Sequence, residues 1–144
     1  HAEGFILDVG SASDRNADPD GFHARERTGP SGPGFRWTKE EASVTFSPVA
    51  GFVPVRLVVK ARAPGAGRVP VRVTVGGLFC GEVSVTPGDF AESALVLPEA
   101  ARTPFRGIDP VRIVLTSPTW VPRDAGQGDD PRALGVGVTR ISLE

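Results

Sequence analysis

The stretch VPVRVTV at residues 69–75 decides the fold class, because a valine stands at every second position and Pro70, Arg72 and Thr74 stand between them. A second alternation runs through residues 55–62, where Val55, Leu57, Val59 and Ala61 oppose Arg56, Lys60 and Arg62. A period of two residues places alternate side chains on opposite faces of a strand, so both stretches predict β-strands with one dry face. Strands of this kind bury their dry faces by stacking two sheets.

Further strands are predicted between clusters of turn-forming residues, since the 18 glycines and 14 prolines are spread along the whole chain. No segment has helical periodicity, although Thr38–Glu41 is compatible with a single turn. In the last strand the apolar parity changes, which predicts a β-bulge near Thr139 and Arg140. The result is an all-β fold, a two-sheet antiparallel β-sandwich of about eight to nine strands. The other predicted strands are residues 5–9, 35–38, 42–47, 78–85, 93–97, 111–117 and 134–143.

Length and charge narrow the classes of function. A chain of 144 residues is expected to form one domain, residues 1–144. The formal net charge of −1 provides no basic face, so we expect no nucleic-acid partner. No apolar run approaches the roughly 20 residues of a membrane span. The chain starts at His1 and contains no methionine, so we expect it to be a piece of a longer polypeptide.

Residues 10–34 form the longest predicted loop, and a connection of this length in a compact domain is usually functional or disordered. It contains the acidic residues Asp14, Asp18 and Asp20, and Asp8 precedes it. Oxygen-rich clusters can bind calcium, but the spacing does not match an EF-hand loop. We expect a solvated, turn-forming cluster and no cofactor, with a structural calcium ion as the alternative.

The only two tryptophans, Trp37 and Trp120, flank the predicted loops. An indole ring can stack under a sugar, with charged and polar groups around it that bind the hydroxyls. The alternative places Trp37 in the core or at a sheet edge. The single Cys80 is interpreted as a small buried apolar residue.

Charged residues of the two loops allow two interpretations. His23 and Glu26 could form an acid/base pair, but ion pairing on the surface is the simpler interpretation. Asp130 is expected to cap a turn and pair with Arg132. A hydrolase or lyase remains an alternative only if His23 and Glu26 converge with Asp130. Arg36 is expected to tie down the long loop through Glu26 or Asp8.

Five motifs in order resemble the β-sandwich domain attached to bacterial polytopic membrane glycosyltransferases related to dolichyl-phosphate-mannose-type mannosyltransferases and aminoarabinose transferases. The resemblance implies a jelly-roll, galactose-binding-like domain outside the cytoplasm, tethered to a membrane enzyme that carries the catalysis. Its signature positions here are Asp8, His23, Glu26, Arg36, Trp37, Asp130, Arg132 and Gly135. The motifs are DVG at 8–10, GFHARE at 21–26, FRWT at 35–38, SPTWVP at 117–122 and DDPRALGV at 129–136.

We therefore expect a non-catalytic domain that binds carbohydrate or presents substrate to a membrane-associated glycosyltransferase. Its partners would be a glycan or lipid-linked sugar and the membrane domain of the parent protein. The alternative is a structural or protein-interaction module without a ligand. The expected ligand-binding residues are His23, Glu26, Arg36, Trp37, Trp120, Asp130 and Arg132, with no catalytic and no metal-binding residues.

Overall fold

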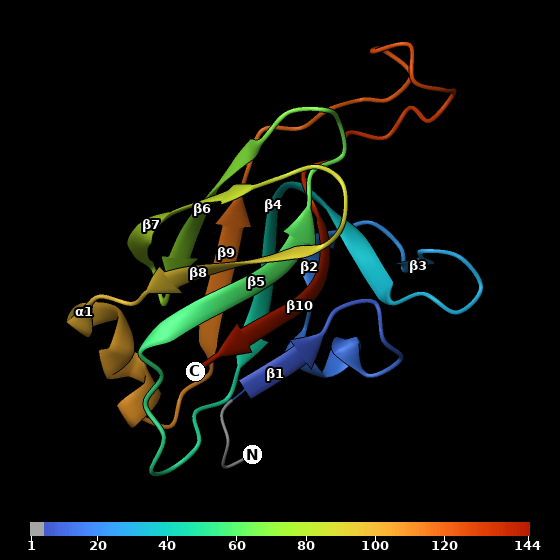
Figure 1. Ribbon diagram of the computed structural model, residues 1–144. Helices are drawn as coiled ribbons and strands as arrows, with labels where there is room; N and C mark the ends of the chain where they lie inside the picture. The colour runs from blue at the N-terminus through green and yellow to red at the C-terminus, as the bar shows by residue number, and fades with distance from the viewer. Residues whose placement is uncertain (1–4) are drawn as a thin grey trace.

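The computed structural model describes residues 5–144 and consists mainly of antiparallel strands (Figure 1). His1 and its three neighbours lie outside the described residues. The strands are β1 (Phe5–Asp8), β2 (Asp20–Phe22), β3 (Glu26–Arg27), β4 (Gly34–Phe46), β5 (Arg56–Arg62), β6 (Val69–Val75), β7 (Leu78–Val85), β8 (Ala91–Val96), β9 (Val111–Thr116) and β10 (Gly137–Leu143).

The strands form two stacked layers that share β4. The path runs β7-β6-β9-β4-β10-β5-β8, with β1 beside β10 and β2 and β3 beside β4. The first half of β4 pairs with β10, whereas its second half, from Glu41 to Phe46, pairs with β9. The long strand therefore crosses from one layer to the other, and the predicted antiparallel β-sandwich is confirmed.

The core lies between the layers. The odd-numbered valines of β6, from Val71 to Val75, are fully buried against β5 and β10 residues such as Leu57 and Ile141. The predicted bulge is confirmed, because the pairing of β10 with β5 shifts between Val138 and Arg140. This shift lets both Val138 and Ile141 face the core despite their opposite parity.

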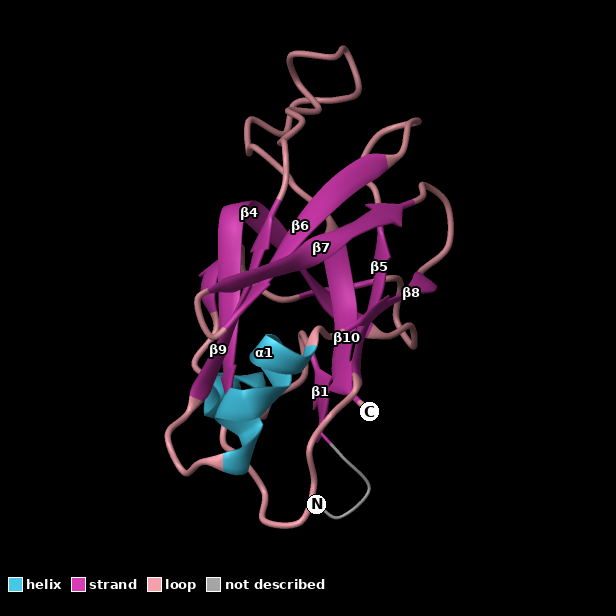
Figure 2. Cartoon of the chain, turned by 90° about the vertical axis from the view of Figure 1, so that its left-hand side faces the viewer, coloured by secondary structure: helices cyan, strands magenta, loops and turns pink. Residues whose placement is uncertain are grey.

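Two predictions about local structure were wrong. The turn proposed at Thr38–Glu41 is continuous strand, because backbone bonds to the segments around Val136 and Ser117 hold both its edges. The helical turns α1 (Glu99–Arg102) and η2 (Thr103–Arg106) were not predicted. Each is only one turn long, too short for a periodic signal, yet Ala101 and Phe105 pack into the core four residues apart. Figure 2 shows these helical turns in cyan at one end of the sandwich.

Residues 10–34 are not a plain loop. They contain β2, β3 and the 3₁₀ turn η1 (Asp14–Ala17). β2 and β3 pair with β4, and Arg36 of β4 binds Asp14 of η1. The segment between β9 and β10 projects from one end of the sandwich, and both ends of the described chain lie at the other end (Figure 1). Within residues 5–144 no helix combines the length and apolar character needed to cross a membrane.

Candidate functional site

The two loops singled out in the sequence meet beside β4. The His23 ring nitrogen Nε2 lies 2.9 Å from the backbone oxygen of Ala133. One residue earlier, Arg132 Nη1 donates to Glu26 Oε2 at 2.8 Å. The structure therefore brings together four of the expected site residues, His23, Glu26, Asp130 and Arg132.

Arg132 is the centre of an ion triad with Glu26 and Asp130. Its Nε and Nη2 donate to the Asp130 carboxylate at 2.8–3.1 Å, and its backbone N–H donates to Asp130 Oδ1 at 2.9 Å. These bonds from the Arg132 side chain and backbone lower the pKa of Asp130 to about 2. The predicted Asp130–Arg132 turn is confirmed, and it also locks the long loop through Glu26.

Arg36 does tie down the long loop, but the expected partners, Glu26 and Asp8, were wrong. Its Nε and Nη2 donate to the two oxygens of Asp14 at 2.7 and 3.3 Å, and Nη1 donates to the His23 backbone oxygen. The η1 turn brings Asp14 back under Gly10, whose N–H also donates to it. Burial raises the pKa of Asp14, but the bonds from Arg36 and Gly10 outweigh burial and leave it below its usual value.

Trp37 is buried, as one of its two interpretations predicted, in a small apolar cluster separate from the one between the layers. Its ring is 8% exposed and packs edge-on against Phe35 at 5.4 Å between centroids. Leu134 and Phe90 complete this smaller cluster. Gly137 on β10 leaves room for it, since a side chain there would begin 3.1 Å from the Trp37 ring. Trp37 therefore offers no ring face to a ligand.

Trp120 remains half-buried at the projecting end of the sandwich. Leu134 pairs with it through two backbone bonds of 2.8 and 2.9 Å, which fix its position. Its indole ring packs against Gly65, where an added Cβ would lie 3.3 Å away. The ring borders a cavity of about 430 Å³ whose other lining residues are Pro64, Gly65, Ala66, Ala125 and Gln127.

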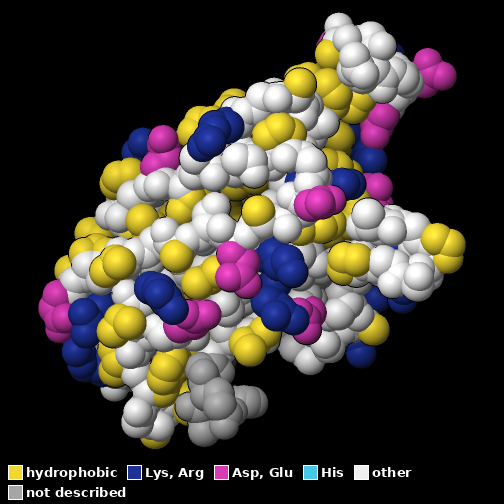
Figure 3. All heavy atoms as spheres, viewed as in Figure 1, with side chains coloured by type: hydrophobic (Ala, Val, Ile, Leu, Met, Phe, Trp, Pro, Cys, Tyr) yellow, Lys and Arg dark blue, Asp and Glu magenta, His cyan; other side chains and the backbone are white. Residues whose placement is uncertain are grey.

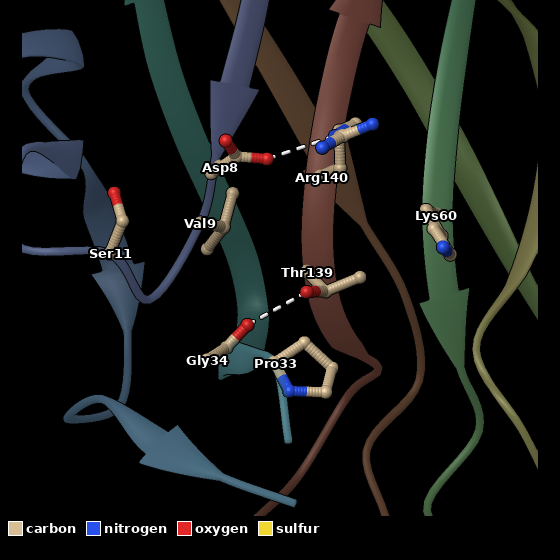
Figure 4. Close-up of a pocket in the computed structure, with 8 residues that line it drawn as sticks. All are labelled: Asp8, Val9, Ser11, Pro33, Gly34, Lys60, Thr139 and Arg140. Atoms are coloured by element: carbon tan, nitrogen blue, oxygen red, sulfur yellow. Dashed lines mark hydrogen bonds and ion pairs between the residues drawn. The ribbon is translucent and has the colours of Figure 1, made fainter. Parts of the chain in front are cut away.

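A second cavity, of about 270 Å³, lies on the outer face of β1, β10 and β5 (Figure 4). Arg140 Nε donates to Asp8 Oδ1 at 2.9 Å on one side of it, and Lys60 stands on the other. Thr139 Oγ1 donates to the Gly34 backbone oxygen at 2.7 Å, and both residues line the cavity. Charged side chains of both signs gather in the middle of this face (Figure 3).

The carboxylates considered for calcium do not converge. Asp14 is bound by Arg36 and Asp8 by Arg140, so each already has a cationic partner. No group of three or more His, Cys, Asp or Glu side chains gathers anywhere in residues 5–144.

The convergence required by the enzyme alternative exists, but Asp130 is unsuited to the role of a general acid. Glu26 and Asp130 both contact the Arg132 guanidinium, and with a pKa of about 2 Asp130 stays ionised near neutral pH. A general acid needs a raised pKa. Cys80 is half-buried, and burial raises the pKa of its thiol, which disfavours the reactive thiolate.

Several residues of these sites are not predicted from the sequence. The prediction for Asp14 is a solvated acidic cluster or a calcium site, and neither includes its pairing with Arg36. Gln127 and Ala66 carry no sequence signal. Pro64-Gly65 is a turn signal in the sequence, but its contact with Trp120 depends on the path of both loops.

By sequence, no family model matches the chain, and no curated protein matches it. Solved structures of similar shape include carbohydrate-binding modules, at identities that establish a common fold only. The family 35 module from Clostridium thermocellum has a TM-score of 0.60 at 13% identity, over 96% of this chain and 95% of that one. The first family 36 module of a multidomain xylanase from the hindgut metagenome of Trinervitermes trinervoides has a TM-score of 0.56 at 12% identity, over 97% and 95%. A family 36 module in complex with calcium and xylotriose has a TM-score of 0.55 at 14% identity, over 97% and 99%.

The comparison confirms the fold predicted by the resemblance, a β-sandwich of the galactose-binding-like type. The relation to membrane glycosyltransferases rests on the sequence motifs alone.

Proposed function

We propose that this chain is a non-catalytic carbohydrate-binding domain whose ligand lies against Trp120. The observation that carries the proposal is the half-buried indole beside a cavity of about 430 Å³ at the projecting end of the sandwich. The shared fold with carbohydrate-binding modules, one of which was solved with xylotriose, supports the same conclusion.

The lining of this cavity suits a sugar. The indole and the apolar surfaces of Pro64 and Ala125 can cover the C–H face of a pyranose, while the Gln127 amide can bind hydroxyl groups. A single stacked sugar yields little net free energy after ordering costs, so we expect dissociation constants of about 0.1–1 mM.

The ion triad and the Arg36–Asp14 pair lie outside the Trp120 cavity and hold in place the loops that form it. Asp130 and Arg132 hold the far end of the segment that carries Trp120 and Gln127, and Glu26 and His23 fasten it to the long loop. In this proposal the role of these charged residues is to stiffen the two loops near the cavity. They are His23, Glu26, Arg36, Asp130 and Arg132. Neither calcium nor another cofactor is part of the proposal.

The parent protein is proposed from the sequence motifs. The domain would be the extracytoplasmic part of a membrane-associated glycosyltransferase and would hold a glycan or lipid-linked sugar near its membrane domain. Sequencing the neighbouring coding region tests this context: several apolar spans of about 20 residues would support it, and a flanking soluble hydrolase would contradict it.

Glycan binding is tested with Trp120→Ala on a glycan array and by calorimetry against the best ligand. We expect binding to disappear while the far-ultraviolet circular dichroism spectrum is unchanged. Phe79→Ala is the matched control, because Phe79 is an aromatic residue on β7 that is 49% exposed and does not line the cavity. Equal binding by the Trp120→Ala variant would refute the site.

An interaction module without a ligand is the second candidate, favoured by exposed aliphatic side chains. Val96 on β8 is 74% exposed and Ile108, after η2, is 93% exposed. A blank glycan array together with association through these residues, lost in Val96→Ser with Ile108→Ser, would favour this function.

A further inference from the structure

Arg62 occupies an unusual position at the end of β5. Its guanidinium carbon lies 5.2, 5.5 and 5.0 Å from the ring centroids of Phe35, Trp37 and Phe90. Its partner across β10 is Gly137, which has no side chain to occupy the space. Three rings therefore hold one cation on the outer face of the sheet.

Among the described residues, no carboxylate pairs with Arg62. Its Nε is buried and donates to no described residue, and within residues 5–144 the guanidinium takes part in no ion pair. Arg36, Arg56, Arg132 and Arg140 all contact a carboxylate. The two Nη groups have no acceptor in residues 5–144 and are not among the buried unpaired atoms, so they are the donors that an outside oxygen can reach.

The neighbouring row of charges does not supply that group. Two residues before Arg62 on the same face of β5, Lys60 pairs in register with Glu92 on one side and Arg140 on the other. Arg140 is in turn paired with Asp8. This row of two cations and two carboxylates balances itself, so none of its carboxylates is in excess to pair with Arg62.

We propose that Arg62 binds the oxyanion of an acidic glycan, a carboxylate or a sulfate group. The rings restrict the plane of the guanidinium, and its N–H groups form a fork that matches such oxygens without reorganisation. Pro64, which lines the Trp120 cavity, is two residues further along the chain, about 7 Å at most in extended backbone. This inference rests on the proposed function, since one acidic oligosaccharide would contact both places.

The direct test is a ¹H–¹⁵N nuclear magnetic resonance titration that observes two side chains at once. The Arg62 Nε–H signal reports on the oxyanion site, and the Trp120 Nε1–H signal reports on the cavity; both are assigned by loss in Arg62→Gln and Trp120→Phe. Glucuronate, galactose 6-sulfate and neutral glucose are added at low ionic strength. We expect the Arg62 signal to shift with the two anions and to stay in place with glucose.

The two signals separate the possible failures. If neither anion shifts the Arg62 signal, the inference is refuted, even if the Trp120 signal responds. If the Arg62 signal shifts and no sugar moves the Trp120 signal, the cavity proposal fails and the oxyanion site stands. A response to only one anion identifies carboxylate or sulfate as the group bound.

Affinity measurements provide the second test. We expect Arg62→Gln to weaken binding of an acidic oligosaccharide about tenfold, as the loss of one charge-assisted contact implies, and to leave a neutral oligosaccharide unaffected. Arg72→Gln is the matched control, because Arg72 stacks on a single ring, Phe79, at 4.2 Å on the other sheet. Should Arg62→Gln fail to fold, Arg62→Lys retains the charge without the planar fork. Undiminished affinity for the acidic ligand in the folded variant would overturn the inference.

Discussion

Trp37 and Trp120 are the same residue type with opposite roles. Trp37 is enclosed by Phe35, Leu134 and Phe90, whereas Trp120 borders an open cavity. We expect Trp37→Ala to lower the free energy of unfolding by about 3–5 kcal/mol, because it opens a cavity in a packed cluster. Urea denaturation measures the loss. A smaller loss than that of Trp120→Ala would contradict these positions.

Gly135 is a second residue on which packing depends. A Cβ there would collide with Thr38 Oγ1 and lie 2.6 Å from Ser117 Oγ. Thr38 Oγ1 also accepts from the Val136 N–H at 2.9 Å, so movement would break a buried bond. We expect Gly135→Ala to cost about 1–3 kcal/mol of stability.

Thermal melting of Gly135→Ala beside Gly67→Ala checks this expectation. Nothing lies within 4 Å of a Cβ at Gly67. A surface change of that kind stays within about 0.5 kcal/mol. Similar melting temperatures for the two variants would mean that the backbone after Leu134 can shift to accommodate the added methyl group without loss of stability, which would contradict the expectation.

At the scale of elements, the ion triad of Glu26, Asp130 and Arg132 should make the contact between the two loops weaken at low pH. The folded-state pKa of Asp130, about 2, lies below its ordinary value of 3.8. Its contribution to stability is therefore fully present above about pH 4 and disappears as the pH falls toward 2. The pKa of Asp14, also lowered, adds in the same direction.

Urea midpoints at pH values between 2 and 5 test the triad. We expect the unmodified protein to be more stable than Asp130→Asn at pH 5 and the difference to shrink toward pH 2. A difference that does not change with pH would mean that the Asp130 charge contributes nothing to folding.

The elements also show what a sequence can and cannot predict. The bulge in β10 was predictable because the parity of Val138 and Ile141 conflicts within one strand. The pairing of Arg36 with Asp14 was not predictable, since it depends on the η1 turn, which has no periodic signal in the sequence. Residues 130–132 were predictable as a turn, but their contact with Glu26 requires the path of both loops.

For the molecule as a whole, β4 makes the two layers one folding unit. The strand pairs with β10 through Trp37 and with β9 through Val44, so neither layer keeps its central pairing without the other. We expect two-state unfolding, with the fluorescence of Trp37 in a Trp120→Phe background following the circular dichroism transition. Two separated transitions would mean that the layers unfold independently.

The pairing of Phe5 with Leu143 brings the two ends of the described chain together, and the segment bearing Trp120 projects from the opposite pole (Figure 1). A resin, a sensor chip or a neighbouring domain attached at either end would therefore lie at the pole opposite the cavity, and the cavity would face away from the attachment. Immobilisation by an affinity tag at either end should therefore leave ligand access unhindered.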